Sequence, residues 1–346
     1  MLTSSPVALS LRIARNVLLA VATICICTAP LYAAANKQGY ESFIVGNPAD
    51  APPSQHLSPG LVLMGGGTDV DAAFQWMCQQ AGGGDFVVIR TTGTDAYNPY
   101  IQQLCPQMDS VETIIITSVA GANSAYVSNQ IQNAEALWIA GGDQSTYVNL
   151  WRGTAVQTGV NFLLNSKQAP VGGTSAGLAV LSQFIYTGEL GSVTSSQALA
   201  NPFHRYVTLD RDLFQSTLGQ GKIYDSHFVT RDRMGRSLVF LARIVDNGWA
   251  AQPRGIGIDE QTALLVSPNG SATMVGIGAA YFLQAPGPAQ VLVAKTPLTY
   301  LNIGVYKVPQ GGTFNLSTWN GNGGVAYTLN VNNGALTSTQ AGGNIY

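Results

Sequence analysis

Between residues 61 and 165, short apolar runs alternate with amphipathic segments of helix length, and this alternation constrains the fold more than any other feature. The apolar runs of strand length cover 61–64, 86–89, 113–117 and 136–139, and the helical patterns cover 69–81, 97–104, 123–132, 145–151 and 156–165. Strands that alternate with helices form βαβ units, whose crossover helices cover the faces of a parallel sheet. We therefore predict an α/β domain with a largely parallel sheet and helices on both faces.

The segments outside this region differ from it in composition. Residues 36–59 are rich in Pro and Ser, and residues 286–346 combine short apolar runs with turns rich in Gly and Asn. Short runs separated by such turns are typical of antiparallel β structure. We predict one α/β domain over residues 60–285 and a small β-rich C-terminal extension over residues 286–346.

The first 35 residues have the pattern of a secretory signal peptide. Arg12 and Arg15 precede an apolar run over 17–26, and the small residues 33–35 follow Pro30. The run is short for a transmembrane span. We expect cleavage near Ala35, a secreted or periplasmic protein and no membrane span after cleavage; an uncleaved N-terminal anchor is the alternative.

Charged residues make up only 10% of the chain, and 16 Lys and Arg face 18 Asp and Glu. Proteins that bind a phosphate backbone carry a basic patch, and this chain has no run of Lys or Arg. We therefore expect no nucleic-acid partner. The few Cys and the 3 scattered His also predict no metal site.

Four cysteines are present, and two of them, Cys25 and Cys27, would leave with the signal peptide. The remaining pair is Cys78 and Cys105. An oxidising compartment would allow a disulfide between them. Two buried thiols are equally compatible with the sequence, because spacing alone does not give the distance between the side chains.

Glycine-rich turns follow several of the predicted strands, at residues 65–67, 141–142 and 172–173. Ligands of open α/β sheets bind at the carboxyl ends of strands. The first turn is not a nucleotide-binding fingerprint, because Val70 stands where its third glycine belongs, and the chain has no GxxxxGK[ST] sequence. Tight turning accounts for these glycines, and we expect no cofactor.

The segment Gly173-Thr174-Ser175-Ala176-Gly177 is a G-x-S-x-G sequence between an apolar strand and an apolar helical stretch. This context holds a serine hydroxyl on a sharp, strained turn at the edge of a sheet. The flanking glycines are needed because a Cβ there would collide with the neighbouring strand and helix. Ser175 is therefore the candidate nucleophile.

A serine nucleophile needs a general base, and the chain has few histidines to offer. His56 lies before the predicted sheet, and His204 lies in a turn. His227 ends a short β-like run that leads into a helical pattern. We predict His227 as the base, with His204 as the runner-up; a packed or surface histidine is the alternative for each.

The third member of such a triad is a carboxylate that orients the imidazole and favours its charged form. The apolar run 255–258 ends in Asp259 and Glu260. We choose Glu260, with Asp259 as competitor and Glu189 as a more distant candidate. Acids at strand ends are also common as caps and turn formers, so a structural role is the alternative to a catalytic one for these residues.

Four segments in this order resemble the cyanophycinases, which belong to the serine peptidase family that also holds dipeptidase E. They are 141–144, 172–177, 225–228 with Arg231, Arg233 and Arg236, and 255–260. The likeness covers roughly residues 60–267 and is closest to the secreted bacterial members. It implies a flavodoxin-like, doubly wound fold and a homodimer.

The resemblance also implies roles for individual residues. Ser175, His227 and Glu260 would be nucleophile, base and orienter, and the N–H groups of Ala176 and Gly142 would stabilise the oxyanion. The substrate would be cyanophycin, a poly-aspartate that bears arginine on each side-chain carboxylate, cut to β-Asp-Arg dipeptides.

The residues expected to contact this substrate are Gln144, Asp225, Arg231, Arg233 and Arg236. Asp225 would pair with a substrate arginine, and the arginine forks would grip carboxylates. A solvated helix face is the alternative for the arginines. Ser226, Asp232 and Leu178 depart from residues common in cyanophycinases, which puts the substrate in more doubt than the triad.

Three hypotheses remain from the sequence. The first is a secreted serine exopeptidase that acts on cyanophycin, and the second is a related peptidase for isoaspartyl or acidic dipeptides. The third is a non-catalytic protein of the same fold that binds polymer or peptide. A class I glutamine amidotransferase is excluded because it needs Cys where this chain has Ser175.

Overall fold

The computed structural model describes residues 38–346. The predicted signal peptide, with Cys25 and Cys27, lies outside the described residues. Within residues 38–346, every helix is too short or too polar to span a bilayer.

The first sheet has ten strands in the order β1-β4-β3-β5-β6-β2-β11-β12-β15-β16. Its parallel strands are β2 (Gly60–Met64), β3 (Asp85–Arg90), β4 (Ser110–Ile116), β5 (Ala136–Ile139) and β6 (Pro170–Thr174). Its antiparallel strands are β1 (Tyr40–Gly46), β11 (Thr262–Val266), β12 (Ser271–Gly276), β15 (Thr313–Asn315) and β16 (Asn320–Asn322). The parallel strands end at one edge, where the candidate residues after β5 and β6 lie.

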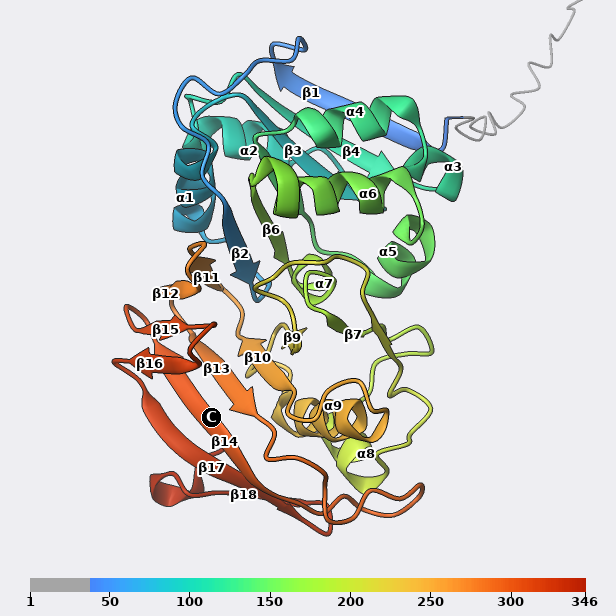
Figure 1. The fold of residues 1–346 in the computed structure, drawn as a ribbon, viewed down its shortest axis with the longest axis vertical. Helices are drawn as coiled ribbons and strands as arrows, with labels where there is room; N and C mark the ends of the chain where they lie inside the picture. The colour runs from blue at the N-terminus through green and yellow to red at the C-terminus, as the bar shows by residue number, and fades with distance from the viewer. Residues whose placement is uncertain (1–37) are drawn as a thin grey trace, which may run out of the picture. The chain divides into compact units, whose positions relative to one another are not determined.

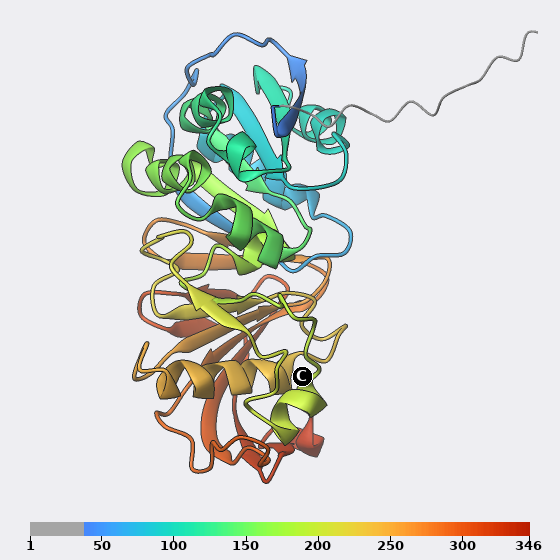
Figure 2. The ribbon, with the colours of Figure 1, turned by 90° about the vertical axis from the view of Figure 1, so that its right-hand side faces the viewer.

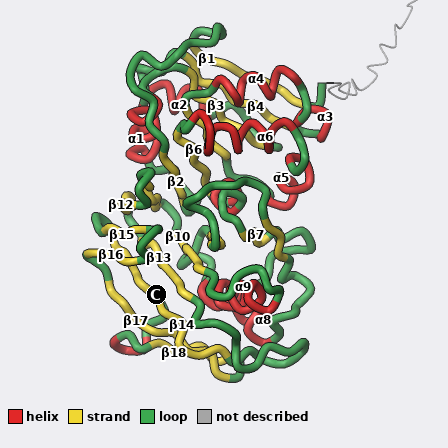
Figure 3. Tube along the Cα trace, in the orientation of Figure 1, coloured by secondary structure: helices red, strands yellow, loops and turns green. Residues whose placement is uncertain are grey.

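The second sheet has eight strands in the order β18-β17-β14-β13-β10-β9-β7-β8. They are β7 (Phe184–Tyr186), β8 (Leu209–Arg211), β9 (Lys222–Asp225), β10 (Arg254–Ile258), β13 (Ala279–Gln284), β14 (Tyr300–Pro309), β17 (Val325–Asn332) and β18 (Ala335–Ser338). Strands β9 and β10 run parallel. Helix α8 (Ser195–Ala200) and its flanking loops separate β7 from β8 in the chain, and Figure 3 shows loops beside β7 and α8.

The helices lie along both sheets (Figure 1). They are α1 (Asp71–Ala81), α2 (Tyr97–Leu104), α3 (Val119–Ala122), α4 (Ala125–Asn133), α5 (Gln144–Trp151), α6 (Ala155–Phe162), α7 (Ala176–Ala179), α8 (Ser195–Ala200) and α9 (Met234–Asp246), with a π-turn η1 (Leu163–Lys167) and a 3-10 turn η2 (Ala341–Gly343). Helix α9 packs on β9 and β10 of the second sheet (Figure 2).

The parallel strands of the first sheet are buried on both faces, and most of their residues are apolar. On strand β2, Leu61 and Leu63 join a core with residues of α4 and α6. The alternate residues, Val62 and Met64, join a second core with residues of α1 and α2. Period-two alternation thus sends successive apolar side chains to opposite helical layers. This arrangement confirms the predicted α/β fold, while a flavodoxin-like arrangement stays a prediction.

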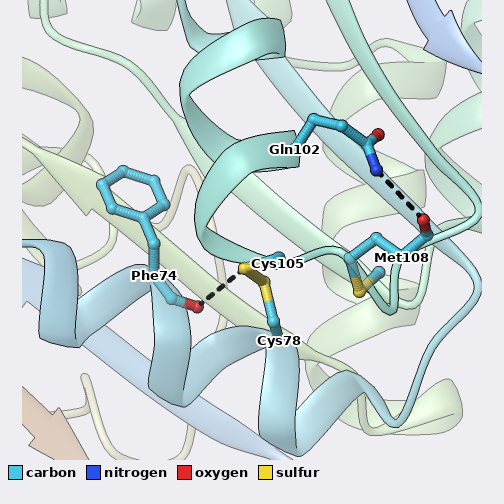
Figure 4. Close-up of a disulfide and its surroundings, with 5 residues drawn as sticks. All are labelled: Phe74, Cys78, Gln102, Cys105 and Met108. Atoms are coloured by element: carbon cyan, nitrogen blue, oxygen red, sulfur yellow. Dashed lines mark hydrogen bonds between the residues drawn. A yellow bond between two sulfur atoms is a disulfide. The ribbon is translucent and has the colours of Figure 1, made fainter.

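A disulfide joins α1 to the end of α2 (Figure 4). The sulfur atoms of Cys78 and Cys105 are bonded, and both side chains are fully buried. The thiol alternative left open by the sequence is therefore wrong. The bond closes the chain over the segment that contains β3, and so fixes the two helices on this face of the sheet relative to each other.

The sequence did not show that residues from distant segments share the sheets. Strand β1, in the Pro/Ser-rich segment before residue 60, pairs with β4. In the C-terminal region, β14, β17 and β18 extend the second sheet from β13, and β15 and β16 extend the first sheet from β12. The C-terminal strands thus continue the sheets that carry the site.

Candidate active site

Ser175 lies on the turn between β6 and α7. Its φ of 54° and ψ of −112° are strained for a non-glycine residue. A Cβ on Gly173 would lie 2.5 Å from the carbonyl carbon of Gly177, and a Cβ on Gly177 would overlap the backbone oxygen of Ile139. Both glycines of the G-x-S-x-G sequence are therefore required by close packing, as the sequence predicts.

His227 belongs to the loop that follows β9 of the second sheet, and only the buried Ser226 separates it from that strand. Its Nε2 lies 2.8 Å from Oγ of Ser175. Its backbone N–H donates a 2.7 Å hydrogen bond to the carbonyl oxygen of Gly65, which follows β2 of the first sheet. His227 also has a positive φ, 47°, so the base and the nucleophile both lie on strained backbone.

Glu260 follows β10, the strand that runs parallel beside β9. Its Oε1 lies 2.5 Å from Nδ1 of His227. The competing acid, Asp259, has other partners, because its Oδ1 accepts hydrogen bonds from the N–H groups of Val229 and Thr230. The structure thus brings Ser175, His227 and Glu260 into one hydrogen-bonded chain. Asp259 instead binds the backbone of the turn that follows His227.

The turn Gly65–Gly67 forms the wall beside His227 and Glu260, a role that the sequence analysis missed. Gly66 has a φ of 101°, and a Cβ there would lie 2.6 Å from Nε2 of His227. A Cβ on Gly67 would lie 3.1 Å from Cβ of Glu260. The signal was a run of glycines directly after a buried strand, but tight turning explained that run equally well.

Burial lowers the pKa of the His227 imidazole from its usual value. The hydrogen bond to Glu260 opposes this shift, and the positive charges of Arg231 and Arg233 add to it. The imidazole is therefore neutral near pH 7. Only the neutral imidazole can accept a proton from a hydroxyl, so this protonation state is the one a general base needs.

Comparison with known proteins finds relatives of this chain at low sequence identity. No family model matches the chain. The cyanophycinase of Nostoc sp. is 25% identical over 216 residues, which cover 60% of this chain and 66% of that protein, just under two thirds of its length. The cyanophycinase of Synechococcus elongatus is 24% identical over 277 residues, which cover 75% of this chain and 80% of that protein.

The chain is thus similar to curated cyanophycinases at 24–25% identity. The resemblance predicted from the sequence motifs is thereby confirmed. A solved structure, a peptidase from an acI-B1 Actinobacterium, matches 75% of this chain and 98% of its own with a TM-score of 0.50 and 16% identity. That likeness is one of fold.

Asp225, at the end of β9, has all its polar contacts inside the protein. Arg236 approaches its carboxylate in bidentate fashion, with Nε 2.8 Å from Oδ2 and Nη2 2.5 Å from Oδ1. Arg233 and Ser237 contact the same carboxylate at 3.2 and 3.1 Å. Burial alone would raise the pKa of Asp225, but the two arginines lower it below its usual value.

These partners change the interpretation of three predicted substrate contacts. Asp225 and Arg236 are 6% and 3% exposed, and the side chain of Arg233 is 13% exposed. Arg233 also donates to the backbone oxygen of Ser226, the residue before His227. The structure thus shows these residues supporting the loop that carries His227. Direct contact of any of them with a substrate stays a prediction.

Arg231 and Gln144 are the predicted contacts that remain accessible. The side chain of Arg231 is 54% exposed, and its Nε lies 3.8 Å from Oε1 of Glu260. Gln144 begins helix α5 and donates to the backbone oxygen of Tyr186 at 3.2 Å. Both belong to segments that meet at the candidate site, from opposite sheets.

The remaining candidates have other surroundings. His204 accepts a hydrogen bond from the backbone N–H of Tyr206 at its Nδ1, and its ring packs on the Tyr206 ring. His56 is exposed, and Glu189 is exposed without an ion pair among residues 38–346. The structure brings none of these side chains into a hydrogen bond with Ser175 or His227.

The predicted oxyanion donors lie on the two turns around Ser175. Ala176 is the first residue of α7, and first-turn amides have no acceptor within their own helix. Gly142 follows β5, and a Cβ on its neighbour Gly141 would lie 3.6 Å from Cβ of Ser175. The two amides thus come from segments adjacent to the serine, and their role stays a prediction.

Tyr346 contacts the loop that follows His227. This contact could not be predicted from the sequence. Its hydroxyl donates to Oδ1 of Asp232 at 2.8 Å and accepts from the N–H of Met234 at 2.9 Å. Its ring packs edge-on against Phe228, the residue after His227. Nothing in the sequence near residue 346 signals a partner more than a hundred residues earlier in the chain.

Proposed function

We propose that this protein is a serine-type peptidase that hydrolyses cyanophycin to β-Asp-Arg dipeptides. The hydrogen-bonded chain from Ser175 through His227 to Glu260 carries the proposal. A hydroxyl, an imidazole and a carboxylate in this order activate a serine nucleophile on several unrelated folds. The flavodoxin-like arrangement of the first sheet belongs to the same proposal, since such sheets bind ligands at the carboxyl ends of their strands.

In the acylation step, Oγ of Ser175 attacks the carbonyl carbon of the scissile backbone amide. Nε2 of His227 takes the hydroxyl proton, and the carboxylate of Glu260 stabilises the imidazolium that forms. The carbonyl oxygen becomes an oxyanion between the N–H groups of Ala176 and Gly142. Collapse of this intermediate breaks the C–N bond, and His227 returns the proton to the leaving amine.

In the deacylation step, water attacks the ester of Ser175. His227 now accepts a proton from the water, and the same N–H groups hold the second oxyanion. Collapse breaks the C–O bond to Ser175, whose oxygen regains the proton from the imidazolium. One of the two products leaves with the amine in the acylation step and the other leaves as the free acid in the deacylation step; they are the dipeptide and the shortened polymer. The enzyme is regenerated, and the cycle needs no cofactor.

The substrate is supported by two observations. The curated relatives from Nostoc sp. and Synechococcus elongatus are both named cyanophycinase. The exposed guanidinium of Arg231, close to Glu260, is a fork that can bind a substrate carboxylate in bidentate fashion.

We also propose that the protein is secreted or periplasmic and that the mature chain forms a homodimer. The disulfide Cys78–Cys105 supports an oxidising compartment. The signal-peptide pattern over residues 1–35 points to the same location. Sizing the purified mature chain by light scattering tests the dimer, and N-terminal sequencing of the exported protein tests cleavage near Ala35.

The decisive experiment measures dipeptide release from purified cyanophycin by the mature chain and by Ser175→Ala. We expect β-Asp-Arg from the first protein alone. Ser175→Ala should lose activity by about 10⁴-fold or more while it keeps its thermal unfolding midpoint. Release by both proteins would overturn Ser175 as the nucleophile.

A serine-directed fluorophosphonate separates the other outcomes. Labelling of Ser175 without dipeptide release would mean a related peptidase, for which isoaspartyl and acidic dipeptides are the next substrates. A folded protein that neither labels nor releases dipeptide would overturn the peptidase and favour a polymer-binding protein of the same fold.

A further inference from the structure

A cavity of about 380 Å³ opens between the start of α1 and the start of α2. Its size lies within the range of about 300–1,000 Å³ that is usual for small-ligand sites. Its lining includes the charged residues Asp69, Asp71 and Arg90 and the hydroxyl groups of Thr68, Tyr97 and Tyr100. The mechanism proposed above uses none of these residues.

The two carboxylates in this cavity, Asp69 and Asp71, form no direct ion pair within residues 38–346, although Arg90 lines the same cavity. Their partners are tyrosine hydroxyls: Tyr97 bonds to Asp69, and the Tyr100 hydroxyl donates to Asp71 at 2.6 Å. Burial raises the pKa of Asp69, Tyr97 and Arg90 oppose the rise, and Asp71 adds to it. A cation in the cavity would relieve this electrostatic cost.

Arg90 does not neutralise the pair through direct contact. Its Nε and Nη1 donate to the backbone oxygens of Thr92 and Thr94 at 2.5 and 3.0 Å. Two carboxylates and one guanidinium leave the lining with a formal charge of −1. The cavity therefore favours a cation over an anion or a neutral group.

Aromatic rings form the rest of the cavity wall. The rings of Tyr97 and Tyr100 lie 6.5 Å apart at an angle of 56°, and both pack on Phe74 of helix α1. A guanidinium is planar and weakly hydrated, and it stacks on aromatic faces while its edge donates to carboxylates. The lining thus matches a guanidinium better than a compact, strongly hydrated ammonium.

The cavity starts beside the candidate triad. Thr68 lines it, and the preceding residue, Gly67, packs against Glu260. Two residues of extended chain separate Gly67 from Asp69, which corresponds to at most about 7 Å. A polymer whose backbone is held at Ser175 can therefore place a neighbouring side chain in the cavity.

A disulfide links α1 to the end of α2, the two helices whose first residues line this cavity (Figure 4). Asp71 and Cys78 both belong to α1, and Cys105 directly follows α2, which carries Tyr97 and Tyr100. Phe74 lies between them: its backbone oxygen faces the sulfur of Cys105, and its ring packs on the tyrosines. The cavity is therefore preorganised, which lowers the entropy cost of binding.

We propose that this cavity is a second subsite, which binds the guanidinium of a substrate arginine next to the cleaved bond through Asp69 and Asp71. The subsite rests on the proposed function for its substrate. It also replaces Asp225 as the partner of a substrate arginine, since the Asp225 carboxylate already pairs with Arg236 and Arg233.

Binding to the Ser175→Ala protein tests the subsite without turnover. The probes are a synthetic trimer of β-Asp-Arg units and the same trimer with citrulline, which has the shape of arginine without its charge. Isothermal titration calorimetry gives the Kd of each. We expect the arginine trimer to bind at least tenfold more tightly, and we expect Asp69→Asn combined with Asp71→Asn to remove most of that difference.

Two further variants make the result decisive. Asp71 is exposed, so Asp71→Asn alone should fold and should still reduce the preference for arginine severalfold. Asp50→Asn makes the same chemical change on an exposed loop outside the cavity, and its preference should equal that of Ser175→Ala alone. An undiminished preference in both cavity variants, or no preference in the parent, would overturn the subsite.

This experiment is independent of catalysis. If the wild-type chain neither labels with fluorophosphonate nor releases dipeptide, the proposed function fails, yet the arginine preference of the cavity is still decided by calorimetry. If the chain cleaves cyanophycin and the cavity variants keep the full preference, the subsite fails and the peptidase stands.

Discussion

The two sheets supply different parts of the candidate site and hold them in different ways. The ten-stranded sheet supplies Ser175 from a strained turn within its own G-x-S-x-G sequence. The eight-stranded sheet supplies His227 and Glu260 from the ends of two adjacent parallel strands. Its loop after His227 is held by the buried charges around Asp225, which are close in sequence, and by the ring of Tyr346, which is distant in sequence.

This difference teaches that the nucleophile can be located from one sequence motif, whereas the position of the base also depends on separate contacts, with Gly65 at its backbone and Tyr346 at the following residue. The two sheets meet at the turn Gly65–Gly67, which follows β2 of the first sheet and contacts His227 and Glu260 of the second. Substitutions in the triad, in this turn and among the buried charges around Asp225 should therefore reduce activity to different degrees.

The largest effect on activity is expected from Glu260→Gln, at the triad residue that follows β10 of the second sheet. Glutamine cannot stabilise the imidazolium, so kcat should fall by about 10³–10⁴-fold with little change in stability. Dipeptide release under saturating polymer measures this. Glu189→Gln, at an exposed carboxylate without an ion pair among the described residues, should keep wild-type activity. Equal loss in both variants would mean that Glu260 does not orient the base.

The next effect is expected where the two sheets meet, from Gly66→Ala. The new Cβ would lie 2.6 Å from Nε2 of His227 and would displace the imidazole from Ser175. A misplacement of this order costs about 10²-fold in kcat. The matched control is Gly153→Ala, which also has a positive φ, 69°, but nothing within 4 Å of the new Cβ. If the control loses as much activity, backbone strain rather than contact with His227 is the cause.

The sequence predicts the first sheet better than the second because its signals are local. Each parallel strand is an apolar run followed by an amphipathic helix, and Ser175 lies within its own G-x-S-x-G sequence. His227 and Glu260 could be selected only because histidines are few and acids end one strand. The choice between Asp259 and Glu260 depends on which side chain reaches the ring, and no sequence pattern encodes that.

The partner of each individual side chain could not be predicted from the sequence. The arginines after His227 were expected to face a substrate, but two of them pair with Asp225, because a buried carboxylate requires charged partners. The glycines at 65–67 were explained by tight turning, although they also make room for the imidazole. Both errors arise because a local sequence pattern does not show which side chains pack against it.

A smaller effect on activity, with a large effect on stability, is expected from Asp225→Asn. Removal of one partner leaves buried guanidinium groups uncompensated, which costs about 3–5 kcal/mol of the free energy of unfolding. Activity per folded molecule should fall about tenfold, since the loop after His227 loses an anchor. The control is Asp210→Asn, whose exposed pair with Arg152 should be worth about 0–1 kcal/mol. Denaturant unfolding compares the two, and equal losses would contradict the anchoring role.

The smallest effect is expected from Arg231→Ala, on the pH profile rather than on the rate. The positive charge of Arg231 helps to lower the pKa of His227, and its Nε lies 3.8 Å from the carboxylate that stabilises the imidazolium. Both contributions disfavour the protonated ring, so removal of Arg231 should raise the pKa of His227. The acid limb of kcat/KM, which reports the free enzyme, should then move to higher pH. Arg152→Ala, at an exposed arginine paired with Asp210, should leave the limb in place. A limb that stays fixed in Arg231→Ala, or moves to lower pH, would mean that Arg231 does not tune the base, and any loss of affinity in that variant would then belong to substrate binding alone.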